Sequence, residues 1–244
     1  MEAFIASTEI STTIWKNHTS FVISFAGCNF KCPWCFVQNQ LEFKREFLVS
    51  LREIKKKITD NLSFIDSVLF TGGEPTLQRQ TIVSLAHVAR SLGLQIGIIT
   101  NGTKPDVLKS LLLEGLLDFI ALDIKSPFEP LLFEEITKSK TYFVKTTEYF
   151  DSIKESIQLL RMHSAQKEIR TTIIPSLLDS KQHIRSIADA LNGIHVEWIL
   201  QRYLPFSKKD IFLKPKETSL QTLVELKNIA MTCSKTLSVS IKED

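Results

Sequence analysis

Residues 20–35 read SFVISFAGCNFKCPWC, and this stretch decides the fold because a strand leads straight into three closely spaced cysteines. The strand, at 20–26, is almost wholly apolar and reads as a buried strand. Cys28, Cys32 and Cys35 follow with the spacing C-x3-C-x2-C, and Trp34 precedes the third cysteine. The segment therefore predicts a strand–loop unit that presents three thiols at the end of a buried strand.

These three thiols predict a metal site. Three thiolates on one short loop can hold three irons of a [4Fe–4S] cube, which leaves the fourth iron open to a substrate or cofactor. Zinc is an alternative, but a closed structural zinc site needs a fourth ligand, and neither His18 nor the distant Cys233 is an obvious one. Disulfides are a further alternative, although cysteines this close rarely pair and their number is odd. We therefore expect the cluster, with Cys233 outside it.

Composition bounds the class of protein. The chain has 244 residues, of which 43% are hydrophobic, and this is enough for one sizeable core. The net charge of +3 neither predicts a nucleic-acid partner nor excludes one. The first residues do not read as a signal peptide, and no apolar stretch is long enough to span a membrane. Four cysteines suit a reducing cytosol, so we expect a cytoplasmic protein with no membrane partner.

Strands alternate with helices along the chain. Apolar runs predict strands at 20–26, 67–70, 94–100, 119–124, 169–174 and 195–200. Helical periodicity lies between most of them, with Gly93 and Gly115 as stops and Asp179 or Ser180 as a cap. A last helix at about 218–231 and a possible strand at 237–241 follow. No break in composition occurs, so we expect one domain over 1–244, with a core at about 20–205 and a C-terminal extension at 206–244.

Six such units fall short of the eight that close a TIM barrel. We therefore expect an α/β fold with an open parallel sheet, a partial (β/α)6 barrel, whose lateral cleft could admit a large substrate. Residues 126–145 contain two prolines and no clear period, and they are predicted to form a long loop over the active site. The charged run 55–57 reads as a solvated helix face.

Polar residues gather at the predicted strand ends, where chemistry in parallel α/β folds takes place. Gly72-Gly73-Glu74 follows the second strand and Asn101 follows the third. A Gly-Gly pair lets the backbone approach a ligand closely, although by itself such a pair is usually a turn. These residues are therefore candidates for binding a cofactor.

Two further strand ends carry charge. Asp123 and Lys125 close the fourth strand with both side chains on one face, which could equally be a rim salt bridge of little energetic value. Arg170, in the fifth strand, could bind a carboxylate in a bidentate manner or be a plain surface arginine. These residues are therefore weaker candidates than the cysteines.

The cysteine triplet and the Gly-Gly-Glu turn together resemble the radical S-adenosylmethionine (SAM) superfamily, over about residues 20–205. The resemblance implies a [4Fe–4S] cluster whose open iron binds SAM and cleaves it to a 5′-deoxyadenosyl radical. It implies that Gly72, Gly73 and Glu74 receive the ammonium group of SAM. It also implies that the adenine ring lies against Trp34. The alternative is that Trp34 only packs in the core.

A closer likeness is to the activating proteins of glycyl-radical enzymes, above all that of anaerobic ribonucleoside-triphosphate reductase. The supporting strings are TGGEPTLQ at 71–78, TNGT at 100–103 and GLLDFIALDIK at 115–125, of which the last is the most diagnostic. In that group the Asp-x-Lys pair, here Asp123 and Lys125, contacts SAM and the glycine-bearing loop, and an arginine placed like Arg170 binds the SAM carboxylate. The resemblance implies a glycyl-radical enzyme as substrate and a flavodoxin- or ferredoxin-type electron donor.

The sequence departs from that group after the third cysteine. Phe36-Val37-Gln38-Asn39 stands where many activating enzymes continue with His-Asn, which leaves the substrate open. One alternative is a radical SAM enzyme that acts on a small heterocycle, as a 7-deazaguanine precursor synthase does, or on tRNA. Another is a non-catalytic module that binds zinc or an iron–sulfur cluster.

Overall fold

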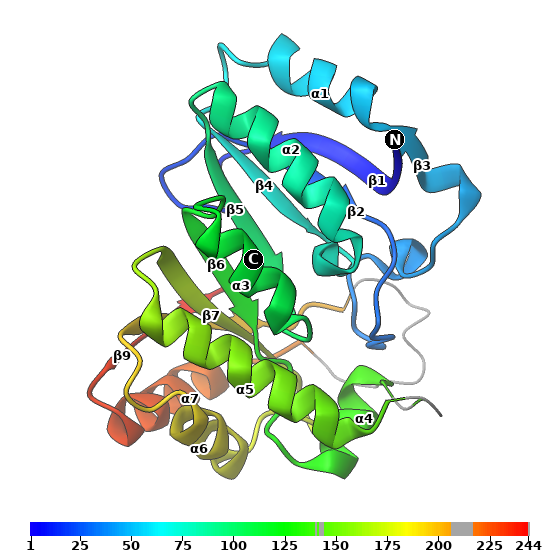
Figure 1. Cartoon of the computed structure of the whole chain (residues 1–244). Helices are drawn as coiled ribbons and strands as arrows, with labels where there is room; N and C mark the ends of the chain where they lie inside the picture. The colour runs from blue at the N-terminus through cyan, green and yellow to red at the C-terminus, as the bar shows by residue number, and fades with distance from the viewer. Residues whose placement is uncertain (140, 142–143, 206–216, 244) are drawn as a thin grey trace.

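The computed structural model describes residues 1–139, 141, 144–205 and 217–243. Within them a single sheet has the strand order β3-β1-β2-β4-β5-β6-β7-β8-β9 (Figure 1). The strands are β1 Glu2–Ser11, β2 Ser20–Phe25, β3 Leu48–Ser50, β4 Ser67–Gly72, β5 Gln95–Thr100, β6 Phe119–Asp123, β7 Gln166–Ile173, β8 Val196–Arg202 and β9 Leu237–Lys242.

All strands from β2 to β9 in that order run parallel to their neighbours, whereas β1 is antiparallel to both β2 and β3. The six predicted strands and the possible C-terminal strand are thus confirmed as parts of an open α/β sheet. The sequence did not indicate β1, because only Ala3 and Ile5 of this strand are buried and the rest is largely polar. Backbone pairing with β2 stabilises this strand, although its apolar pattern is too weak to predict it.

The helices pack against one face of this sheet (Figure 1). They are α1 Leu51–Asp60, α2 Arg79–Ser91, α3 Pro105–Leu113, α4 Pro130–Thr137, α5 Thr146–Met162, α6 Lys181–Ala190 and α7 Leu220–Cys233. Of the two N-caps expected for α6, Asp179 and Ser180, the structure shows Ser180, which accepts a hydrogen bond from the backbone N–H of His183. Among the described helices none is long and apolar enough to cross a membrane.

Strand alternation divides the core into two parts. Phe21, Ile23 and Phe25 of β2 belong to the large cluster shared with the helices. The intervening Val22 belongs to a small inner cluster, formed by Trp15, Val22, Leu69, Phe119 and Ala121, in which Trp15 stacks on Phe119. One member of this inner cluster, Val22, also lines the cavity described below.

The prediction of a long loop at 126–145 is wrong. Pro130–Thr137 forms α4, in which Phe133 and Ile136 are buried. Phe133 packs edge-on against Phe30 of the cysteine loop, with the ring centroids 5.5 Å apart. A helix of eight residues that begins at a proline gives too little periodicity to be seen in sequence. Residues 140, 142–143 and 206–216 lie outside the described part of the chain.

Candidate functional site

A cavity of about 440 Å³ lies at the carboxyl ends of the parallel strands. This volume falls within the range of small-molecule sites, roughly 300–1,000 Å³. Every site residue that the sequence predicted lines it, except Glu74: Cys28, Cys32, Trp34, Cys35, Gly72, Gly73, Asn101, Asp123, Lys125 and Arg170. The fold thus brings together segments that are spread over about 140 residues of chain.

The Gly-Gly turn is shaped by its contact with the cysteine loop. Gly72 has a φ of +108°, a conformation that other residues rarely adopt. A Cβ atom on Gly73 would lie 2.2 Å from the carbonyl oxygen of Gly27, which also accepts a 2.8 Å hydrogen bond from the backbone N–H of Glu74. Glycine at both positions therefore lets the end of β4 lie directly against the loop that carries the thiols.

The three thiols are withdrawn from solvent. Cys32 is buried, and Cys28 and Cys35 are partly buried. Burial raises the pKa of Cys28 and of Cys32 to about 12, so the free thiols are protonated at neutral pH and a metal must displace their protons. Among the described residues, no three His, Cys, Asp or Glu side chains are grouped so as to hold one metal ion. A [4Fe–4S] cube has a different requirement, because each thiolate binds a separate iron.

Backbone hydrogen bonds hold the cysteine loop from two sides. The N–H of Cys28 donates to the carbonyl of Leu41 at 3.0 Å, and the N–H of Lys31 donates to the carbonyl of Thr137, the last residue of α4, at 2.8 Å. Phe30 packs edge-on against Tyr149 of α5 as well as against Phe133. The loop is therefore fixed by α4, by α5 and by the chain that follows the third cysteine.

Glu74 has a different place from the one expected for a cofactor contact. Its side chain is 1% exposed, and its carboxylate accepts hydrogen bonds from the Thr100 hydroxyl at 2.7 Å and from the Asn101 backbone at 2.8 Å. The backbone and hydroxyl of Thr76 also donate to it. Burial raises the pKa of Glu74, and these four donors act against that shift. Glu74 thus joins the ends of β4 and β5, while its contact with SAM stays a prediction.

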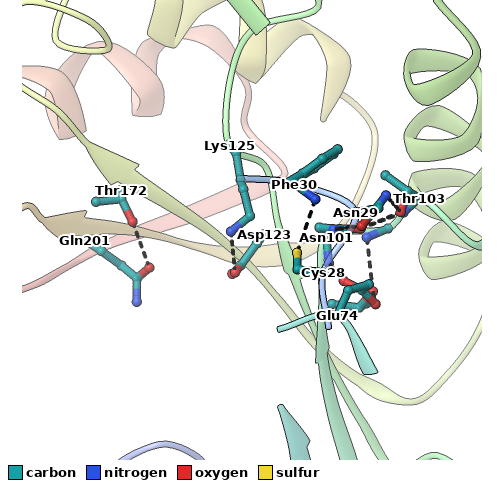
Figure 2. A network of polar contacts seen from close by, with 12 residues as sticks. Cys28, Asn29, Phe30, Glu74, Asn101, Thr103, Asp123, Lys125, Thr172 and Gln201 are labelled. Carbon is teal, nitrogen blue, oxygen red and sulfur yellow. Dashed lines mark hydrogen bonds and ion pairs between the residues drawn. The ribbon is translucent and has the colours of Figure 1, made fainter. Parts of the chain in front are cut away.

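Asn29, between Cys28 and Phe30, continues this network into the cysteine loop (Figure 2). Its amide donates to the Thr103 hydroxyl at 2.8 Å, and its side-chain oxygen accepts from the Asn101 amide at 2.9 Å. Asn101 in turn accepts from the backbone and hydroxyl of Thr103. Sequence reasoning missed Asn29, because the residues it bonds lie more than 70 positions away.

Removing this side chain should weaken the cysteine loop. We expect Asn29→Ala to lower the free energy of unfolding by about 1–3 kcal/mol, because the partners of its two partly buried hydrogen bonds lose them. We also expect the reconstituted protein to lose iron faster. Chemical denaturation of the cluster-free protein and iron release to a chelator measure the two effects. The matched control is Asn61→Ala, at the residue that follows α1, which removes an amide whose exposed hydrogen bond goes to the Lys57 carbonyl. An equal effect of both substitutions would contradict the role given to Asn29.

Asp123 and Lys125 form an ion pair in the cavity wall, with 3.0 Å between the lysine Nζ and the Asp123 Oδ2. Burial opposes the charge on Lys125, but the neighbouring Asp123 carboxylate, with further contributions from Cys32 and Cys35, outweighs burial and raises the pKa of the lysine. Asp123 Oδ1 is buried without a hydrogen-bond partner among the described residues. The pair is therefore more than an exposed rim salt bridge, because it leaves an acceptor oxygen for a bound molecule.

Arg170 is held in the wall of the same cavity by two partners. Its guanidinium pairs with Glu168 and donates to the carbonyl of Ile14 at 2.9 Å. Burial raises the pKa of Glu168, although Arg170 opposes the shift. Trp34 is 8% exposed and lines both the main cavity and a small adjoining one. Both residues lie where a cofactor could reach them; the SAM carboxylate and adenine contacts stay predictions.

The donor set fits a cluster with SAM. Three thiols share one cavity with glycine backbone that a Cβ would obstruct, with an acceptor oxygen on Asp123 and with a guanidinium on Arg170. A ligand with both an ammonium and a carboxylate group needs such a mixture of acceptors and donors. Cys28, Cys32 and Cys35 would hold the cluster, and Gly72, Gly73, Asn101 and Arg170 would contact SAM.

Comparison with protein families places the chain. Residues 22–191, which include the cysteines and the strand-end motifs, match the model of the Radical SAM superfamily. A protein of Methanocaldococcus jannaschii, which carries the provisional name of glycyl-radical enzyme activating enzyme, is 33% identical over 91% of each chain. The pyruvate formate-lyase-activating enzyme of Clostridium pasteurianum is 24% identical over 71% of this chain and 69% of its own.

Two other matches are more limited in what they show. The 7-carboxy-7-deazaguanine synthase of Hyperthermus butylicus is 34% identical, but over only 35% of this chain and 36% of its own. The crystal structure of a radical SAM methyltransferase from Sphaerobacter thermophilus shares the fold, with a TM-score of 0.72 at 13% identity over 97% of this chain and 70% of that one.

The cavity, its three thiols and the extent of the family match agree with one another. The match spans the sheet from β2 through α6 and so contains the whole set of predicted cluster and SAM residues. Zinc binding and a non-catalytic module give no account of the strand-end residues that meet in the same cavity. The chain belongs to the radical SAM superfamily and is an enzyme that uses a [4Fe–4S] cluster and SAM.

Proposed function

We propose that this enzyme removes a hydrogen atom from a glycine of a partner protein and so activates a glycyl-radical enzyme. One hydrogen atom leaves the glycine Cα and passes to the 5′ carbon derived from SAM, and an external donor supplies one electron. The cluster and SAM together provide this one-electron, hydrogen-abstracting chemistry. The names of the two activating-enzyme relatives support the proposal.

The observation that carries the proposal is the Asp123–Lys125 pair. Lys125 holds one oxygen of Asp123, while the other oxygen, Oδ1, is an unused acceptor in the cavity wall. An extended polypeptide brings both N–H donors and carbonyl acceptors, and a fixed acid beside a fixed cation can serve both kinds of group. The cavity is also lined by Glu9 of β1 and Lys242 of β9, so it reaches strands near both edges of the open sheet.

A second candidate substrate has one observation in its favour. Phe36, directly after the third cysteine, lines the cavity and is 50% exposed. An exposed aromatic ring beside the cluster loop could stack on a planar heterocycle or a nucleobase. The partial match to a 7-carboxy-7-deazaguanine synthase points the same way, although it spans about a third of the chain.

The test is the formation of a protein radical. We expect that the reconstituted enzyme, mixed anaerobically with SAM, a reductant and a glycyl-radical enzyme from the same genome, yields a doublet-like glycyl signal in electron paramagnetic resonance. Lys125→Ala should reduce this signal more than it reduces SAM cleavage in the absence of the partner. Lys57→Ala, on the exposed face of α1, is the matched control and should leave both unchanged.

Turnover of a small heterocycle or of tRNA, with no radical on any protein, would decide for the second candidate. An equal loss of both signals in Lys125→Ala would remove the substrate role of the pair and leave it a SAM contact alone.

A further inference from the structure

A second cavity, of about 410 Å³, lies beside the cysteine loop and opens to solvent. All of its lining residues come from 31–44, that is, from the cysteine loop and the chain that follows it. The two walls are tied together, because Cys28 N–H donates to the Leu41 carbonyl and the Gln38 amide donates to the Pro33 carbonyl. We call this feature the loop groove.

The loop groove and the main cavity share a wall. Cys32 and Leu41 line both spaces. Cys32, which would be a cluster ligand, therefore borders both spaces. Cys32 itself is 6% exposed, so bulk water has little access to it.

An electron carrier needs a route to the cluster that is separate from the main cavity. The reaction consumes one electron from outside, and the main cavity is the space in which SAM and the substrate must both lie. A carrier that used the same opening would compete with the substrate, and it would leave the reacting groups open to water. The loop groove offers a separate approach, because its lining comes from 31–44 and shares two residues, Cys32 and Leu41, with the main cavity.

The charges on the groove favour an acidic carrier. Lys31 and Lys44 are exposed, and neither forms an ion pair with a described acidic side chain. Glu42 is the one acid among the described lining residues, so the two lysines give the groove an excess of positive charge. Beyond Lys44, the exposed Arg45 and Glu46 carry opposite charges and leave this excess unchanged. Exposed charges at the edge of an interface act mainly on the rate of association and on its salt dependence.

We propose that the loop groove is the docking surface for a small, acidic one-electron carrier protein. The carrier is oxidised by one electron and the cluster is reduced by one, with the electron entering past Cys32. The proposal rests on Cys32 as a cluster ligand, and it does not depend on which substrate the enzyme uses.

Charge reversal tests it. The variant K31E/K44E and the control R52E/K57E, which reverses two exposed charges on α1, change the net charge equally. Bleaching of the cluster is followed by stopped flow, with an acidic flavodoxin hydroquinone or with uncharged photoreduced 5-deazariboflavin as reductant. We expect K31E/K44E to slow reduction by flavodoxin about tenfold at low salt and less at high salt, and to leave reduction by deazariboflavin unchanged.

A second experiment measures carrier binding to the cluster-free enzyme. Oxidised flavodoxin should bind the cluster-free enzyme, and K31E/K44E should weaken this binding where R52E/K57E does not. K44E alone, which lies outside the cysteine loop, should give a smaller loss in the same direction.

Equal effects of both double variants on the flavodoxin reaction would overturn the proposal, as would a loss of deazariboflavin reduction in K31E/K44E. Because no step of this test needs a glycine substrate, its outcome is separate from that of the radical assay.

Discussion

Replacement of Cys32 by alanine should abolish SAM cleavage. Cys32 is the most buried of the three cysteines that line the cavity. Without its thiolate, two protein ligands would remain, which is too few to bind a [4Fe–4S] cluster stably. Anaerobic reconstitution should give about four irons per wild-type chain and far fewer in Cys32→Ala. Release of 5′-deoxyadenosine from SAM by the reduced protein should fall to background. Iron analysis and chromatography of the products measure the two effects.

Cys233→Ser is the matched control. Cys233 ends α7, its thiol donates to the Ile229 carbonyl at 3.3 Å, and it does not line the cavity. We expect this variant to match the wild type in iron content and in SAM cleavage. Stoichiometric zinc without iron in the wild-type protein would refute the assignment of the three cysteines to a cluster.

Glu74→Ala should have the largest effect on stability. It removes the acceptor for two hydroxyls and two backbone N–H groups, all buried at the junction of β4 and β5. The cost of leaving such groups unsatisfied is about 3–5 kcal/mol of unfolding free energy. Denaturation of the cluster-free protein measures this cost without any contribution from cofactor binding. Glu53→Ala, at an exposed position in α1, should change stability little.

Glu74→Gln distinguishes the structural role from a contact with SAM. Glutamine keeps one acceptor oxygen but turns an amide towards one of the four donors, so we expect a smaller loss of stability. If Glu74 made a direct charged contact with the SAM ammonium, the loss of that contact in Glu74→Gln would weaken SAM binding by about 1.5–3 kcal/mol, or roughly 10–150-fold. Weaker SAM binding in Glu74→Gln at full cluster-free stability would contradict the role of Glu74 as a strand junction.

Local patterns were enough to predict most of the sheet. The parallel strands β2, β4, β5 and β6 are short, mainly apolar runs bounded by glycine or polar residues, and these signals act over a few neighbouring positions. The strand β7 is more polar, and its apolar end at Ile173 and Ile174 gave the weaker signal. β1 was not predicted, since half of its residues are polar and it is held in the sheet by pairing with β2 and β3. α4 was taken for loop, because its short helix is stabilised by the burial of Phe133 against the cysteine loop.

The features of the candidate site also fall into those that local motifs predict and those that tertiary packing decides. The sequence by itself determined the three thiols, the glycine turn and the Asp-x-Lys pair, since each is a motif of neighbouring residues at a strand end. Because parallel strands end at one edge of the sheet, it also determined that these motifs would meet.

Only the tertiary structure decided what each side chain touches. It turned Glu74 away from the cavity into a buried junction, and it tied Asn29 to Asn101 and Thr103. It also made Cys32 a wall shared by two cavities. These are contacts between residues up to 74 positions apart, and the packing of whole segments fixes their geometry, which no local pattern encodes.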